Sequence, residues 1–137
     1  MTPETVARLT VVRAYRDLSN LARHGVGNSL SGAGARERIE EARRLRVLAN
    51  ALVDLVVLSE ALAGTPWQVI TQALNRSDAE TVQGEYAEAV TAWQAVPAEA
   101  FEGIGGDARD LDTWYRAHRD DSDPVAQNPA SDLLQAD

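Results

Sequence analysis

Cysteine and lysine are both absent from this sequence of 137 residues. Without cysteine the chain has no disulfide bonds, no thiolate zinc sites and no cysteine nucleophiles. Aromatic residues make up only 5% of the chain, whereas alanine occurs 23 times and leucine 14 times. Alanine and leucine are strong helix formers, and aromatic residues are enriched in strands, so the composition favours an all-α fold over a β-sandwich.

A targeting segment and an uninterrupted apolar run are also missing. The first residues, MTPE, lack the basic start and apolar stretch of a signal peptide. The most apolar stretch, residues 45–63, is interrupted by Arg46, Asn50, Asp54 and Glu60, and central charges make membrane insertion costly. We therefore expect a cytoplasmic protein that has no membrane partner.

The charge is unevenly distributed along the chain. Residues 1–76 carry ten arginines against seven acidic residues, whereas residues 77–137 carry three arginines against fourteen. The net charge of −8 therefore arises in the second half of the chain. Such a division indicates an acidic tail, or a region that repels nucleic acid.

Apolar periodicity and helix-ending residues divide the chain into five segments, none with the alternating pattern of a strand. They are an N-terminal helix over residues 1–24, a Gly/Ser linker over 25–34, a long helix and two shorter ones over 35–96, a C-terminal helix over 97–119, and a disordered acidic tail over 120–137. The prediction is thus an all-α fold of four to five helices.

The helices within residues 35–96 have recognisable ends. They are expected at about 35–63, 66–74 and 77–94. Thr65 caps the short middle helix, and Asn75 tolerates the left-handed conformation that a tight turn needs. Ser77 and Glu80 form a capping box that starts the next helix. Further on, Asp107 is expected to cap the C-terminal helix.

A short helix, a tight turn and a longer helix make a helix-turn-helix, whose second helix can lie in the DNA major groove. The spacing of eight residues over about 61–93 also resembles small actinobacterial helix-turn-helix proteins and the related region 4 of sigma factors. These residues are Ala61, Gly64, Trp67, Ile70, Ala73, Leu74, Ser77 and Tyr86. Trp67 and Tyr86 are expected to share the small core of the unit.

Double-stranded DNA is therefore one expected partner. Thr81 and Gln83 are placed to contact bases, and phosphate contacts require arginines. Arg76 is the only base near the second helix, and arginines of the long helix would supply further phosphate contacts. The candidate DNA-binding residues are Arg76, Ser77, Thr81, Gln83, Arg43 and Arg44.

The acidity of the same helix favours an alternative function. Asp78, Glu80, Glu85 and Glu88 are all predicted to be exposed, and four carboxylates facing a polyanion are unfavourable. The alternative to a DNA-binding transcriptional regulator or accessory factor is a helical protein–protein interaction module, an adaptor or a dimerisation protein, that does not bind DNA.

The long helix predicts a homodimer. Residues 47–58 are apolar around most of the helix, and a second copy across a two-fold axis would bury the surface that remains. The alternative is that the C-terminal helix folds back and completes a monomeric core. Arg46, Asn50 and Asp54 lie four residues apart and share one face, which is either the solvated side or a polar contact to another helix or subunit.

No motif indicates an enzyme. His24 and His118 are isolated near predicted helix ends, where a cation is favourable. The glycine-rich residues 25–34 follow no strand and precede no Gly-Lys-Ser/Thr, so they do not form a phosphate loop. We expect no catalytic residue, no metal site and no cofactor.

Overall fold

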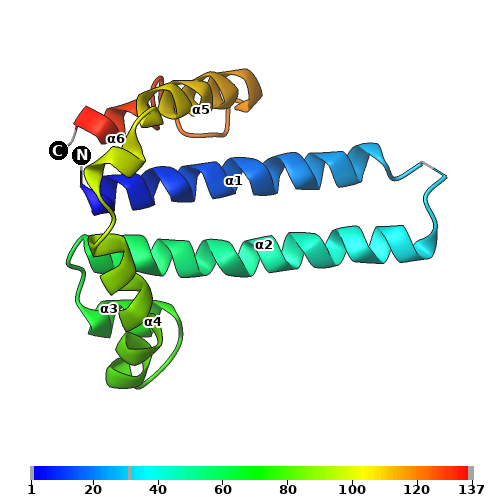
Figure 1. Cartoon of the computed structure of the whole chain (residues 1–137). Helices are drawn as coiled ribbons and strands as arrows, with labels where there is room; N and C mark the ends of the chain where they lie inside the picture. The colour runs from blue at the N-terminus through cyan, green and yellow to red at the C-terminus, as the bar shows by residue number, and fades with distance from the viewer. Residues whose placement is uncertain (1, 31, 136–137) are drawn as a thin grey trace.

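The computed structural model describes residues 2–30 and 32–135, and within them the chain is all-α. Helices α1 and α2 form a long antiparallel hairpin, with α5 and α6 on the outer side of α1, and α3 and α4 at the C-terminal end of α2 (Figure 1). The elements are α1 (Pro3–Gly27), α2 (Ala35–Leu62), α3 (Trp67–Ala73), α4 (Ala79–Gln94), the 3-10 helix η1 (Ala98–Phe101), α5 (Ile104–His118) and α6 (Ser131–Gln135).

The predicted fold class is confirmed, although the described residues form six α-helices rather than four or five. Over the same residues, no helix combines the length and the apolar content that crossing a membrane requires.

Helix α1 ends later than the sequence predicts. It continues to Gly27 instead of ending near residue 24, because its last turn packs against α2. His24 Nδ1 lies 3.1 Å from Glu41 Oε1, and a Cβ atom on Gly25 would lie 3.6 Å from the same oxygen. The linker therefore begins at Asn28 rather than at residue 25, and residue 31 within it lies outside the described part of the chain.

Two predicted helix caps are wrong, although the helices they belong to are present. The Thr65 hydroxyl donates to the Glu60 carboxylate at 2.7 Å, and Pro66 occupies the N-cap position of α3. Asp78, rather than Ser77, caps α4, because its carboxylate accepts hydrogen bonds from the backbone N–H groups of residues 80 and 81. A carboxylate at this position also interacts favourably with the helix dipole.

Two apolar clusters lie on opposite sides of the hairpin. One holds α3 and α4 against α2 through Val57, Ile70 and Val82, the last of which is fully buried. The other holds α5 and α6 against α1 through Leu9 and Leu111. The C-terminal helix therefore folds back into an apolar core, but it covers α1 and not α2. The choice between a dimer and a monomer stays a prediction.

The segment after α4 also differs in detail from the prediction. Residues 97–119 form η1 and α5 rather than one helix. Gly103 adopts a positive φ of 83°, which lets the chain turn into α5 at Ile104, so Asp107 lies in the first turn of α5 and not at its cap.

The prediction of a disordered tail is wrong for residues 120–135. The Asp112 carboxylate of α5, which is 2% exposed, accepts hydrogen bonds from the backbone N–H of Ala130 at 2.7 Å and of Ser131 at 3.2 Å. Ala130 is itself fully buried against Leu111 and its neighbours. One buried carboxylate thus orders a segment whose polar composition indicates disorder. Residues 136–137 lie outside the described residues.

Replacing Asp112→Ala should lower the free energy of unfolding by about 2–3 kcal/mol, because the N–H of Ala130 would remain buried without an acceptor. Equilibrium unfolding in urea measures this change. Asp110→Ala, at an exposed position of the same helix, is the control and should change stability little. Equal stability of the two variants would show that the Asp112 contact does not order the tail.

Candidate functional site

The α3–α4 unit is built on a tight turn and a shared apolar core. Asn75 adopts a φ of 57°, the left-handed conformation expected for it, and its N–H donates to the carbonyl of Gln72 at 2.9 Å. The rings of Trp67 and Tyr86 stack with their centroids 6.3 Å apart. The prediction that these two aromatic residues share a core is therefore confirmed.

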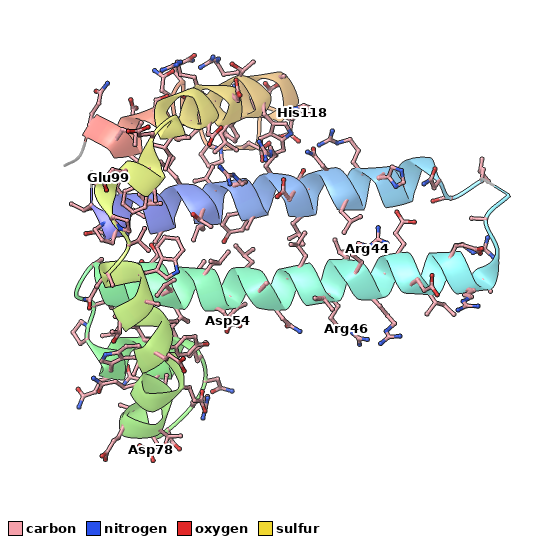
Figure 2. All side chains as sticks on the ribbon, viewed as in Figure 1. Arg44, Arg46, Asp54, Asp78, Glu99 and His118 are labelled. Carbon is pink, nitrogen blue, oxygen red and sulfur yellow. The ribbon has the colours of Figure 1, made fainter. Side chains whose placement is uncertain are left out.

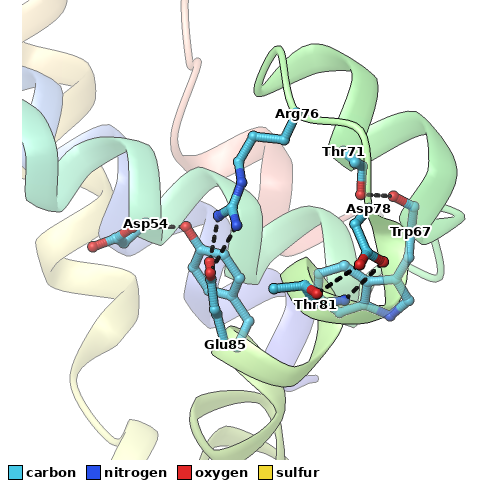
Figure 3. Close-up of polar contacts among 8 residues, drawn as sticks. Asp54, Trp67, Thr71, Arg76, Asp78, Thr81 and Glu85 are labelled. Atoms are coloured by element: carbon cyan, nitrogen blue, oxygen red, sulfur yellow. Dashed lines mark hydrogen bonds and ion pairs between the residues drawn. The ribbon is translucent and has the colours of Figure 1, made fainter.

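A hydrogen bond ties α4 to α2 beside this core. The Tyr86 hydroxyl donates to Asp54 Oδ1 at 2.8 Å (Figure 3). Burial, the hydrogen bond to Asp54 and the charge of that carboxylate together raise the pKa of Tyr86 to about 12. The neutral phenol thus fixes the angle between α4 and α2 at neutral pH.

Arg76 is neutralised within the unit. Its Nη1 and Nη2 atoms donate to the two carboxylate oxygens of Glu85 at 2.6 and 2.9 Å (Figure 3). This hydrogen-bonded contact raises the pKa of Arg76 and lowers the pKa of Glu85. Two parallel hydrogen bonds are the strongest arrangement that arginine makes with a carboxylate. Among the described residues 76–94, the one basic side chain is therefore already paired.

The other candidate residues on α4 are partly occupied as well. The Thr81 hydroxyl donates to Asp78 Oδ2 at 2.8 Å, as part of the helix cap. Hydrogen bonds from Thr81 lower the pKa of Asp78, so this carboxylate is charged at neutral pH. Ser77 and Gln83 are exposed. The structure thus brings Arg76, Ser77, Thr81 and Gln83 together, but engages two of their side chains internally.

Arg43 and Arg44 lie far from this group. Both are exposed on the half of α2 near the hairpin loop, whereas α4 packs on α2 at Val57. At about 1.5 Å per residue, Arg44 and Val57 are roughly 20 Å apart along the helix axis. Arg44 also lies on the side of α2 that faces α1 (Figure 2). The structure does not place these two arginines beside α4.

A second exposed surface runs along α2. We call it the Asn50 face, and it consists of Arg46, Val47, Asn50, Val53 and Asp54, all exposed. Arg46 and Asp54 point away from α1 (Figure 2). The two valines are 68% and 47% exposed, so this face presents apolar as well as polar side chains.

An apolar groove adjoins the Asn50 face. It lies between α1, α2 and α3 and is lined by Tyr15, Val53, Val56, Ile70 and Leu74. The sequence did not indicate that Tyr15 lies at the surface. Its side chain is 55% exposed, although α1 is covered on two sides by other helices. The sequence also did not indicate Glu85 as the partner of Arg76, since nine residues and a turn separate them. No local spacing rule would have indicated either one.

Neither a metal site nor a similar protein indicates what this surface binds. Over residues 2–30 and 32–135, no group of three histidine or carboxylate side chains is placed to hold a metal ion. Comparison with protein-family models, with curated proteins and with solved structures finds no match to this chain. Any function is therefore to be argued from the surfaces of α2, α3 and α4.

The phenol of Tyr86 makes stability depend on pH in the alkaline range. The folded pKa of about 12 lies above the unfolded value, so the stabilisation is complete below about pH 10 and is lost as pH rises through 12. We expect the free energy of unfolding to fall less steeply between pH 10 and 12 in Tyr86→Phe than in the wild type. Tyr15→Phe, at an exposed position, is the control. Identical slopes in the wild type and Tyr86→Phe would contradict the assignment.

Proposed function

We propose that this chain is a helical protein–protein interaction module, and that residues 65–94 form a helix-turn-helix unit that does not bind DNA. The observation that carries the proposal is the charge of α4. Residues 76–94 contain four acidic side chains and one arginine, and all five are exposed. Such a helix would face the phosphates of DNA with an excess of negative charge.

The pairing of Arg76 strengthens this inference. Phosphate contacts supply most of the affinity of DNA-binding proteins. They need arginines whose side chains are free to bind phosphates and release the counterions of the DNA. Arg76 would first have to leave the two hydrogen bonds to Glu85. Releasing Glu85 would also expose another unpaired carboxylate next to the DNA. The contact between Arg76 and Glu85 therefore opposes the binding of DNA.

Exposed apolar surface supports a protein partner instead. Tyr15 and Val53 line the groove beside α3 and are 55% and 47% exposed, and Val56 and Leu74 line the same groove. Apolar side chains gathered in this way commonly mark a contact surface for another protein. The polar residues around the groove would form the rim of such an interface.

DNA binding by a transcriptional regulator is the second candidate function. The observation that favours it is the succession of a short α3, a left-handed Asn75 and an α4 with exposed Gln83. A second helix in this arrangement can lie in the major groove.

A titration of random duplex DNA distinguishes the two functions. We expect the wild type to show no binding in fluorescence anisotropy at low salt. The variant Glu80→Arg/Glu88→Arg reverses two exposed charges on α4 and should gain binding that weakens steeply with salt, if α4 can reach DNA. Ala87→Arg/Ala92→Arg adds positive charge to α4 without removing acids and is the matched control, which should gain less.

Each result bears on a different part of the proposal. Salt-dependent binding by the wild type would contradict the interaction module and favour the DNA-binding regulator. Absence of binding by the charge-reversed variant would show that the helix-turn-helix assignment is wrong, because the acidity of α4 would not be what prevents contact with DNA.

A further inference from the structure

The charges of the Asn50 face are complementary to those of a second copy of the same face that runs in the opposite direction. Arg46 lies four residues before Asn50 and Asp54 lies four residues after it, so opposite charges flank a neutral polar centre. Val47 and Val53 lie three residues before and after it, and both are apolar. All five side chains are exposed, and Arg46 and Asp54 share the side of α2 turned away from α1 (Figure 2).

We propose that a second copy of this chain covers the Asn50 face, with the two α2 helices antiparallel across a two-fold axis that passes beside Asn50. This inference rests on the proposed interaction function and names its partner. In a two-fold interface each contact occurs twice. Arg46 therefore meets Asp54 of the partner subunit, Asp54 meets Arg46 of the partner subunit, and the two copies of Asn50 meet at the axis.

Helix geometry is compatible with this pairing. Arg46, Asn50 and Asp54 form one row of residues spaced four apart, and rows of this kind are the ridges of a helix surface. When rows of this kind on two helices interdigitate, the helices cross at about −50°, the commonest class of helix packing. The valines lie beside the row, so their exposed side chains would enter the contact and lose water.

The position of Asp54 is also fixed in advance. Tyr86 donates its hydroxyl hydrogen to Asp54 Oδ1, which restrains the carboxylate without changing its charge. Oδ2 is then the acceptor for Arg46 of the partner subunit. A side chain that is already held in place loses less conformational entropy when it enters an interface.

The wider charge distribution favours the same orientation. Residues 36–46 carry five arginines against three glutamates, whereas residues 76–94 carry one arginine against four acidic residues. The hairpin loop and the α3–α4 unit lie at opposite ends of α2 (Figure 1). An antiparallel pair directs the basic half of each α2 toward the acidic α4 of the other copy, and a parallel pair would place like charges together.

A cysteine crosslink tests the position of the axis. The chain contains no cysteine, so Asn50→Cys introduces its only thiol. Under mild oxidation this variant should form a covalent dimer in high yield. Ala51→Cys is the matched control, because residue 51 is exposed and adjacent but points about 100° further round the helix. Equal crosslinking of the two variants, or none by Asn50→Cys, would overturn the proposed axis.

Charge reversal with rescue tests the contacts. In sedimentation equilibrium the wild type should be a dimer, and Arg46→Asp and Asp54→Arg should each raise the dimer Kd by about tenfold or more, because like charges then meet twice. The double variant Arg46→Asp/Asp54→Arg should restore the dimer. Tyr86→Phe removes the hydrogen bond that restrains Asp54 but keeps the charge of Asp54, and should raise the dimer Kd by less than either charge reversal.

Three outcomes would overturn the proposal: a monomeric wild type, a dimer that neither single reversal weakens, or a double variant that does not recover. Each of them leaves the DNA titration unaffected. If the wild type is monomeric and also fails to bind DNA, the partner of the interaction module is a different protein. If it is monomeric and binds DNA, both proposals are wrong.

Discussion

The incomplete covering of α2 is the constraint on which the rest of the molecule depends. This helix has 28 residues, and α1 packs along one side of it. On the opposite side, α3 and α4 reach only the C-terminal end, where Val57 joins their core. Helices α5 and α6 pack on α1 instead, held by Leu9, Leu111 and the Asp112 carboxylate. The Asn50 face therefore stays exposed, and apolar side chains stay exposed with it.

The contact between α4 and α2 has an electrostatic consequence. Stacking of Trp67 on Tyr86 and the hydrogen bond from Tyr86 to Asp54 fix α4 at the end of the hairpin. With α4 held there, Glu85 reaches Arg76 and neutralises it. The remaining exposed charge of α4 is negative. This charge would repel the phosphates of DNA, although α4 follows α3 and the turn as the second helix of a helix-turn-helix does.

The sequence predicts the parts of this fold that depend on local chemistry. The bounds of α2 follow from its apolar pattern and from Gly64, and the turn at Asn75 follows from the conformational freedom of asparagine. What it misses depends on contacts between distant residues. Asp112 accepts hydrogen bonds from a segment 18 residues further on, and Asp78 rather than the adjacent Ser77 caps α4. Of the candidate residues, Arg76, Ser77, Thr81 and Gln83 lie on the α3–α4 unit as expected, but the internal pairing of Arg76 and Thr81 was not predicted, and Arg43 and Arg44 lie elsewhere.

We propose that the interacting surface lies on α2, with α4 as its acidic neighbour. Hydrogen exchange measured at increasing protein concentration tests this most directly, because amide protection reports which surface becomes covered on association. We expect protection over residues 43–54 to rise with concentration, while protection over residues 79–94 changes much less. Protection of α2 that is independent of concentration, or a rise confined to α4, would contradict the account.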